Sequence, residues 1–477
     1  MPTDPTPSAW LLRSVEIDGE RCDVRVRAGR IIAIAPLLAH DADERVFEAR
    51  GAALLPGLHD HHVHLLALAA ALESLRCGPP DVRTRDELAG VLRRAAETAD
   101  RERGLRGVGY HESVAGDLDR HDLDRWAADV PVRIQHRSGI RWILNSRALE
   151  RLGPIRPERR PPGFEIGRDG SPTGRIDRQD GWLRERLGEP GLPDLARVGA
   201  LWAAFGVTGV CDATPGNDAS VVAILESALD RGALPQRLLL MGGAGLPGSD
   251  HPRIRRGALK WMLDEDRLPE RETLVASIRD SHAAGRGVAF HCVTRAELVF
   301  AASALEEAGC TPWDRIEHAS LAPPDCIELL ARLPLCVVTQ PNFLCERGDA
   351  YRADVAPADH RWLYRGRGFV AAEVALAAGT DAPFGEPDPW RAMRAAVDRR
   401  TAGGHAFAPE EALTPEEALC LFTTPLESPG WRTRRIVPGS VADLCLLDRP
   451  WREARDRLSA DDVCATWAAG RLVWDRG

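Results

Sequence analysis

The chain has very little lysine, no long hydrophobic run and no excess of positive charge. Residues 65–72 form an apolar stretch of only eight residues, far short of the roughly 20 that a membrane-spanning helix needs. The first ten residues show no basic segment leading into an apolar one, so no secretory signal is expected. The eleven cysteines lack CxxC spacing. We therefore expect reduced, buried thiols in a cytoplasmic protein.

The charge balance argues against large anionic partners. Sixty-two basic and 71 acidic residues give a net charge of −9, whereas nucleic acids and anionic membranes select basic surfaces. We expect a small-molecule substrate, no nucleic-acid partner and no membrane partner, with a homodimer as one expected assembly. The 477 residues, 44% of them hydrophobic, suffice for one large catalytic domain with a smaller one beside it.

The lysine content draws attention to one position. Lys260 is the only lysine, and the other 61 basic residues are arginine. Lys260 is therefore a candidate for chemistry that a guanidinium cannot perform, such as reaction as a neutral amine. The alternative is that the single lysine lies at this position by chance. The location of Lys260 in the fold decides between the two.

The order of segments predicts an α/β fold with a (β/α)8 barrel. Strand-like, apolar runs alternate with helical patterns in the middle of the chain, as in a parallel barrel. The expected barrel strands are residues 53–64, 206–214, 237–243, 258–263, 287–292, 315–318, 335–341 and 375–381. We expect a small β-sandwich formed from both chain ends, residues 1–55 and 430–477. We expect the barrel to be formed by residues 56–429. An insertion at about 75–205, with helical pieces at 85–103, 119–129 and 191–204, is expected to cover the active site.

Polar residues gather at the carboxyl ends of these strands. His62 and His64 are two residues apart, so a strand directs both imidazoles to one face. Further polar residues at equivalent positions of later strands are Lys260, His291, His318 and Asp381. Barrel enzymes carry their chemistry at this end, so these residues predict a metal centre. The neighbouring His59 and His61 are expected to serve packing or to support the ligands from behind.

Several motifs together resemble the amidohydrolase superfamily, most of all its amidohydrolase-3 branch. They include PGLHDHHVHL (56–65), NSRAL (145–149), DRIEHASL (314–321), TQPNF (339–343), GTDAPFGEPDPW (379–390) and VPGSVADLCLLD (437–448). The resemblance implies a divalent metal centre of one or two ions, with Lys260 carboxylated by CO2. The ligands that it implies are His62, His64, Lys260, His291, His318 and Asp381. Zinc is favoured by the imidazole-rich ligand set, while manganese or iron would suit mixed nitrogen and oxygen ligands.

The expected activity is hydrolysis of a non-peptide C–N bond in an N-acyl, N-formyl or cyclic amide. Metal-activated hydroxide would attack the carbonyl, and Asp381 would act as the catalytic general base and acid. The alternatives are deamination of a heterocycle and hydrolysis of an ester or lactone at the same centre. A non-catalytic scaffold is disfavoured because none of the expected ligands is missing.

Substrate-binding candidates lie mainly in the insertion. Between residues 131 and 187 the chain has 13 arginines against seven acidic residues, which favours an anionic substrate. A guanidinium can hold a carboxylate with two parallel hydrogen bonds. The candidates for substrate binding are His136, Arg137, Arg141, Trp142 and Gln340.

Overall fold

The computed structural model describes residues 9–187 and 192–477. The chain forms two compact units. One, here called the barrel unit, extends to Leu65 and resumes at Leu195, ending at Gly477. The other, Leu66–Asp194, is here called the insertion unit. Each is described by itself.

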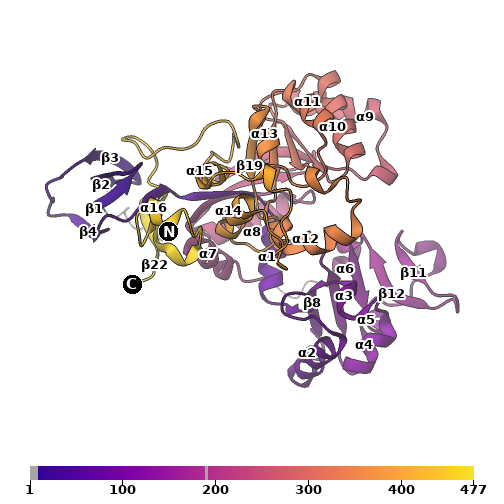
Figure 1. Ribbon diagram of the computed structural model, residues 1–477. Helices are drawn as coiled ribbons and strands as arrows, with labels where there is room; N and C mark the ends of the chain where they lie inside the picture. Colours follow the sequence, from indigo (N-terminus) through magenta and orange to yellow (C-terminus); the bar gives the residue numbers. More distant parts are fainter. Residues whose placement is uncertain (1–8, 188–191) are drawn as a thin grey trace. The chain divides into compact units, whose positions relative to one another are not determined.

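Eight parallel strands of the barrel unit form a sheet that closes almost completely into a barrel (Figure 1). The order along the sheet is β6, β13, β14, β15, β16, β17, β18 and β19. Between its two ends, Val63 and Ala382 form a parallel bridge. This confirms the predicted α/β barrel. The strands are β6 (Leu58–Val63), β13 (Val207–Asp212), β14 (Arg237–Gly242), β15 (Ile254–Met262), β16 (Val288–Cys292), β17 (Arg315–His318), β18 (Cys336–Thr339) and β19 (Ala375–Ala378).

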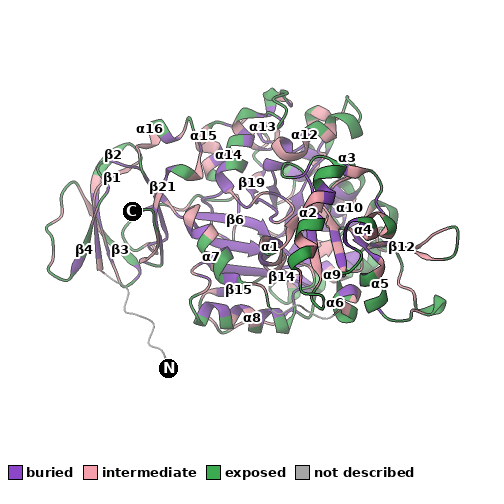
Figure 2. Ribbon diagram, turned by 90° about the horizontal axis from the view of Figure 1, so that it is seen from below, coloured by how far each residue is buried: buried purple, intermediate pink, exposed green. Residues whose placement is uncertain are grey.

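The barrel strands are buried on both faces, which explains their nearly continuous apolar sequences. Figure 2 shows them as buried ribbons with helices outside whose outer faces are exposed. These helices are α7 (Leu195–Ala204), α8 (Ala219–Asp230), α9 (Arg271–Ala283), α10 (Arg295–Ala308), α11 (Pro324–Ala331), α12 (Asn342–Asp354), α13 (Arg367–Ala371), α14 (Pro389–Asp398) and α15 (Pro415–Cys420). Inside the barrel, Cys211, Met241, Ala258 and Ala289 belong to one buried apolar cluster.

Short connections fix the strand ends where polar residues lie. Helix α10 begins three residues after β16, and Thr294 caps it by accepting a hydrogen bond from Glu297 N (3.2 Å). The Glu297 carboxylate in turn accepts one from Thr294 N (3.0 Å). This capping box stabilises the helix start and thereby the strand end that carries His291.

The first predicted strand is in fact two. We expected residues 53–64 to form one strand, but the chain passes from one sheet to another at Gly57. Strand β5 (Leu54–Pro56) pairs antiparallel with β20 (Leu444–Leu447), whereas β6 pairs parallel with β13. A Cβ at Gly57 would lie 2.4 Å from Thr208 Cγ2, so the crossing point requires glycine.

The chain ends build a small two-sheet domain, as predicted. One sheet has the order β3–β2–β1–β4 and the other β22–β21–β20–β5. Trp10 and Trp467 meet edge to face at 5.8 Å in its shared apolar core. The elements are β1 (Ala9–Ile17), β2 (Glu20–Arg27), β3 (Arg30–Ala35), β4 (Glu44–Glu48), β21 (Val463–Ala468), β22 (Arg471–Asp475) and α16 (Trp451–Ala454).

The insertion unit contains a sheet that the sequence did not predict. Its six strands have the order β11–β12–β10–β9–β8–β7, whereas we expected only helical pieces. The elements are β7 (Leu75–Arg76), β8 (Leu105–Tyr110), β9 (Val132–His136), β10 (Arg141–Leu144), β11 (Phe164–Ile166), β12 (Pro172–Asp177), α1 (Leu65–Leu72), α2 (Arg85–Thr98), α3 (Glu112–Ala115), α4 (Arg120–Ala127), α5 (Ser146–Arg151) and α6 (Asp180–Leu187).

The boundaries also differ from the expected 75–205. Helix α7, which we had placed in the insertion, packs against β13, β21 and β22 and so belongs to the barrel unit. That the insertion covers the active site stays a prediction.

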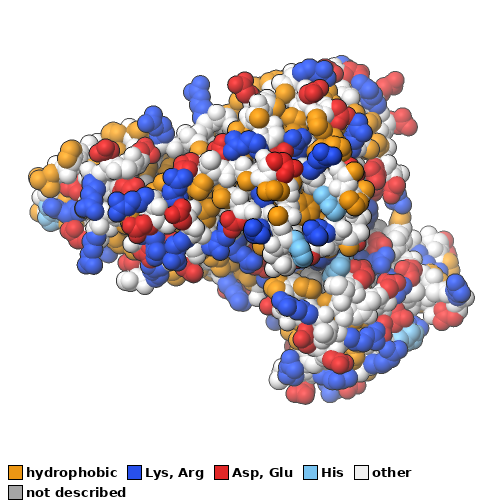
Figure 3. Space-filling model, in the orientation of Figure 1, with side chains coloured by type: hydrophobic (Ala, Val, Ile, Leu, Met, Phe, Trp, Pro, Cys, Tyr) orange, Lys and Arg blue, Asp and Glu red, His pale blue; other side chains and the backbone are white. Residues whose placement is uncertain are grey.

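Two further features concern the length of the helices and the charge of the surface. Within the described ranges, no helix combines the length and apolar character that crossing a membrane requires. On the face drawn in Figure 3, basic and acidic side chains are interspersed.

Candidate metal centre

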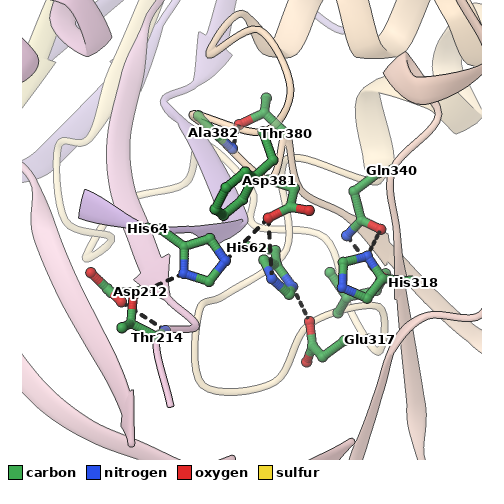
Figure 4. Close-up of polar contacts among 12 residues, drawn as sticks. His62, His64, Asp212, Thr214, Glu317, His318, Gln340, Thr380, Asp381 and Ala382 are labelled. Carbon is green, nitrogen blue, oxygen red and sulfur yellow. Dashed lines mark hydrogen bonds and ion pairs between the residues drawn. The ribbon is translucent and has the colours of Figure 1, made fainter. Parts of the chain in front are cut away.

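The carboxyl ends of the barrel strands bring together His62, His64, His318 and Asp381 (Figure 4). His62 is the last residue but one of β6 and His64 follows the strand, and the His62 ring lies 4.8 Å from that of His318. The His318 and His291 rings are 4.5 Å apart. The Asp381 carboxylate lies among them, with Oδ1 3.2 Å from His64 Nε2 and 3.6 Å from His62 Nε2.

Three of the imidazoles are oriented in the same way. Nδ1 of His62 is held by Glu317 (2.5 Å), that of His64 by Thr214 Oγ1 (2.9 Å) and that of His318 by Gln340 Oε1 (2.6 Å). In His62 and His318 the partner oxygen accepts the Nδ1 proton, which leaves the lone pair on Nε2, whereas the hydroxyl of Thr214 can donate to His64 or accept from it. In His62 and His64, Nε2 is the atom nearest Asp381. A lone pair on Nε2 is what coordination through that atom requires.

The backbone carrying Asp381 is tied to the end of β6. Asp381 N donates to His62 O (2.8 Å), and His64 N donates to Ala382 O (2.8 Å). Asp381 has φ +56° and His318 has φ +69°, a region that side chains other than glycine rarely adopt. Such strain costs of order 1–3 kcal/mol per residue and clusters at functional sites.

Asp60 adds a second tie between these segments. Its carboxylate accepts hydrogen bonds from Thr380 N (3.0 Å), Thr380 Oγ1 (2.6 Å) and His62 N (3.2 Å). Burial raises the pKa of Asp60 to about 7. Its role in holding the ligand-bearing backbone was not assigned from the sequence, although it is part of the quoted motif at 56–65.

Glu317 is another polar residue that the sequence analysis missed. It is fully buried and is held by Arg315 at 2.7 Å, while Arg315 also donates to His61 O (2.8 Å). Burial alone would raise the pKa of Glu317, but Arg315, Lys260 and His62 lower it well below the usual range. The carboxylate is therefore ionised and accepts the His62 proton. Two charged residues within a buried strand were the available signal.

The protonation states suit metal binding. Burial lowers the pKa of His62 to about 4 and that of His318 to about 3. Burial would raise the pKa of Asp381, but the surrounding histidines, His62 first, lower it overall. Neutral imidazoles and an ionised carboxylate are the forms that coordinate a cation.

Lys260 lies on β15 beside these groups. Its register partner on β16 is Ala289, and Met262 is aligned with His291. The Nζ atom is buried and has no hydrogen-bond partner among the described residues, and burial lowers the pKa of the ammonium. Burying an amine without a hydrogen-bond partner costs folding free energy. A lysine at this position therefore suggests a role beyond stability.

The donor set fits a divalent cation. Ligand atoms of His62, His318 and Asp381 all lie within 4.8 Å of one another. Imidazole nitrogens with a carboxylate are typical of zinc sites. The unpartnered Lys260 amine adds a position where a further anionic ligand could be made.

The other histidines of the first motif face elsewhere, as expected. His59 Nδ1 donates to Thr424 O (2.8 Å), and His61 Nε2 contacts Thr424 Oγ1 (3.0 Å). Both rings are buried. Gln340 contacts His318 Nδ1 (2.6 Å) and orients its ring, and its predicted part in substrate binding stays a prediction.

The remaining substrate candidates lie in the insertion unit and have partners there. Arg141 donates to both carboxylate oxygens of Asp177, at 2.8 and 3.0 Å. Trp142 is 5% exposed and donates to Asp180 (2.8 Å). Arg137 N donates to Tyr110 O. Their predicted part in substrate binding stays a prediction.

A second His–Glu–His group occurs in the insertion unit. Ligand atoms of His111, Glu112 and His136 also lie within 4.8 Å of one another. However, backbone N–H groups of Ser113 and Ser138 donate to Nδ1 of the two histidines, at 3.2 and 3.1 Å. The neutral rings then carry their proton on Nε2, and that of His136 points to Glu112 (3.0 Å). This tautomer does not suit metal coordination through Nε2.

Comparisons with known proteins agree with the barrel fold. The amidohydrolase family model matches residues 45–474. The chain belongs to the amidohydrolase family. The prediction of an enzyme of this family is thereby confirmed, while its substrate is a separate question.

Individual relatives are distant but span nearly the whole chain. An N-substituted formamide deformylase of Arthrobacter pascens is 26% identical, over 91% of this chain and 90% of that protein. The putative amidohydrolase YtcJ of Bacillus subtilis is 24% identical, over 89% and 90%. An uncharacterized metal-dependent hydrolase of Pyrococcus horikoshii has a similar fold, with a TM-score of 0.72 and 21% identity over 93% of this chain and 98% of that one.

Proposed function

We propose that this amidohydrolase cleaves a non-peptide C–N bond in an N-acyl, N-formyl or cyclic amide, using a divalent metal, with zinc favoured. One observation carries the proposal. Held imidazoles direct Nε2 toward Asp381, next to the buried Lys260 amine, for which the described part of the chain supplies no hydrogen-bond partner. The relative named as a formamide deformylase supports the N-formyl class.

The chain would hold the metal through His62, His64, His291, His318, Asp381 and a carboxylated Lys260. A neutral Lys260 amine adds to CO2, forming a C–N bond and releasing one proton, which gives the carbamate. Burial of the amine favours its neutral form. The carbamate would replace an unsatisfied amine by an anion suited to the cation.

A divalent cation at this position polarises a carbonyl and lowers the pKa of water. Asp381 is ionised and so can accept the proton of the attacking water at its carboxylate. It can then deliver that proton to the leaving nitrogen, which is otherwise a poor leaving group. Glu317, Thr214 and Gln340 keep the histidine rings fixed during these steps, because each holds one Nδ1.

The test is a substrate panel on the full-length protein loaded with Zn²⁺. The panel contains N-substituted formamides, N-acetyl amines and cyclic amides, together with amino-substituted heterocycles, esters and lactones. We expect release of amine and carboxylate from the amide group, loss of activity on chelation, and recovery when Zn²⁺ is added. Asp381→Asn should abolish turnover.

Two results would contradict the proposal. Release of ammonia from the heterocycles alone would identify a deaminase. Turnover confined to esters or lactones would assign the centre to C–O bonds.

A further inference from the structure

Helix α12 carries an arginine, Arg347, close to the turn that bears Asp381. Arg347 lies on the first turns of this helix, directly after β18, with its guanidinium 3.9 Å from the centre of the Phe343 ring. Its Nη2 donates to the carbonyl oxygen of Phe384. The Phe384 amide in turn donates to Asp381 O (2.8 Å), so the guanidinium lies beside the turn that bears Asp381.

The neighbouring arginines have their charge or donors satisfied. Arg315 is paired with Glu317 at 2.7 Å, and Arg365 with Glu411 at 2.8 Å. Arg399 donates to four carbonyl oxygens. Within the described residues, Arg347 has one hydrogen bond and no carboxylate within 4.0 Å. A guanidinium has five N–H donors, so most of those of Arg347 have no protein acceptor.

The groups around Arg347 do not supply the missing acceptor. The nearest acidic neighbour in sequence, Glu346, accepts from Asn342 Nδ2 (3.2 Å) and Glu386 N (3.1 Å) instead. Tyr351 and Tyr364 contact each other through their hydroxyl groups (3.3 Å). Asp381 acts on Arg347 through its charge alone. It is also one of the residues that would hold the cation.

The ring of Phe384 links this position to the reaction centre. It packs edge to face on His64, with ring centres 5.2 Å apart, and its carbonyl oxygen accepts from Arg347. One residue thus contacts both the histidine cluster and the guanidinium, and we expect the substrate to extend from the histidines toward Arg347. The guanidinium itself lies over a different ring, that of Phe343. A guanidinium stacked on an aromatic ring is common in sites that bind planar anions.

We propose that Arg347 binds a carboxylate at the far end of the substrate, so that the enzyme acts on amides that carry a second, anionic group. This inference rests on the proposed function, whose substrate class it narrows. The residue that selects the anionic group of the substrate would then lie in the barrel unit. Arg141, the earlier candidate, already has its guanidinium engaged by Asp177.

A binding experiment tests this without requiring turnover. Dicarboxylates from malonate to adipate, each compared with the monocarboxylate of equal carbon number, are titrated by calorimetry into the Zn²⁺-loaded protein. We expect one chain length to bind about 10- to 100-fold more tightly as the dicarboxylate, as for hydrogen bonds to charged groups. In Arg347→Gln that ratio should fall to about one, and in Arg347→Lys to an intermediate value.

The controls separate specificity from structure. Arg352→Gln removes an exposed arginine of the same helix and should leave the ratio unchanged. Arg141→Ala should also leave it unchanged. A ratio that survives in both Arg347 variants, that is lost in Arg141→Ala, or that is absent from the wild type at every length would overturn the proposal.

A kinetic arm uses the same variants once an amide substrate is known. A formamide bearing a carboxylate is compared with one bearing a hydroxymethyl group at that position. Arg347→Gln should raise KM for the carboxylate alone, whereas a structural role would affect both substrates alike. Absence of turnover with every amide would count against the proposed function, while the dicarboxylate ratio would still decide the role of Arg347.

Discussion

The Glu317 carboxylate lies 2.5 Å from Nδ1 of His62, and Arg315 holds that carboxylate from the other side at 2.7 Å. Arg315, Glu317 and His62 form a buried chain of polar contacts, and this chain fixes the tautomer of His62. Glu317→Gln should therefore weaken Zn²⁺ binding by about 10- to 100-fold, the usual effect of removing such a supporting carboxylate. Competition with a chromophoric chelator measures the affinity.

The same substitution leaves Arg315 buried without its charge partner, which typically costs about 3–5 kcal/mol of folding stability. Two further variants distinguish metal affinity from stability. Arg315→Met combined with Glu317→Gln should recover stability but not affinity. Glu328→Gln, on the exposed side of α11, should change neither. Wild-type affinity in folded Glu317→Gln would show that His62 does not need this partner.

Lys260 gives the second prediction. Lys260→Ala should lower the number of Zn²⁺ ions per chain and the activity, because the anionic ligand can no longer form. Short carboxylates such as acetate or propionate should restore part of both. Metal content is measured by mass spectrometry of the desalted protein, with ¹³CO2 incorporation as an independent readout. Full metal content and activity in Lys260→Arg would disprove the carbamate, because a guanidinium does not add to CO2 under these conditions.

Close backbone contact gives the third prediction. A Cβ added to Gly379 would lie 2.4 Å from His62 N and 2.5 Å from His62 Cβ. Gly379→Ala must therefore displace His62 or its strand, and overpacking of this kind costs about 1–3 kcal/mol. We expect a lower Tm together with weaker Zn²⁺ binding. Gly245→Ala is the matched control, since its added Cβ would meet no atom within 4 Å, and only an equal effect in both variants would contradict the argument.

The barrel was predictable from sequence because burial on both faces leaves a direct trace. Its strands are short apolar runs, and the ligands His291 and His318 stand at their carboxyl ends. The insertion sheet left no such trace. Strands β7 and β11 have two and three residues, and all six are separated by turns and helices, so no regular alternation emerges.

Residues whose role depends on distant partners were also missed. Glu317 meets His62 across 255 positions of the chain, and a sequence pattern does not encode that pairing. The role of Arg347 depends on which other arginines are already paired, and this follows only from the packed structure. Gln340 was singled out correctly as polar at a strand end, but its contact with His318 could not be foreseen.

The last prediction concerns pH and a buried carboxyl group on α12. Burial raises the pKa of Glu346 from 4.5 to about 7. A folded-state pKa above the unfolded one means that the protonated form favours folding. The stabilising contribution is complete below pH 4.5 and is lost as the pH rises through about 7. By the usual conversion this amounts to at most about 3 kcal/mol.

Glu346→Gln stays neutral at every pH and keeps an oxygen that can accept from Asn342 Nδ2 and Glu386 N. The Tm of the variant minus that of the wild type should therefore be near zero at pH 4.5 and should become positive as the pH rises to 8. Thermal unfolding followed by circular dichroism across this range measures the difference. Glu306→Gln, at an exposed position of α10, should show no such rise. A difference that stays flat between pH 4.5 and 8 would mean that Glu346 ionises as readily in the folded chain as in the unfolded one.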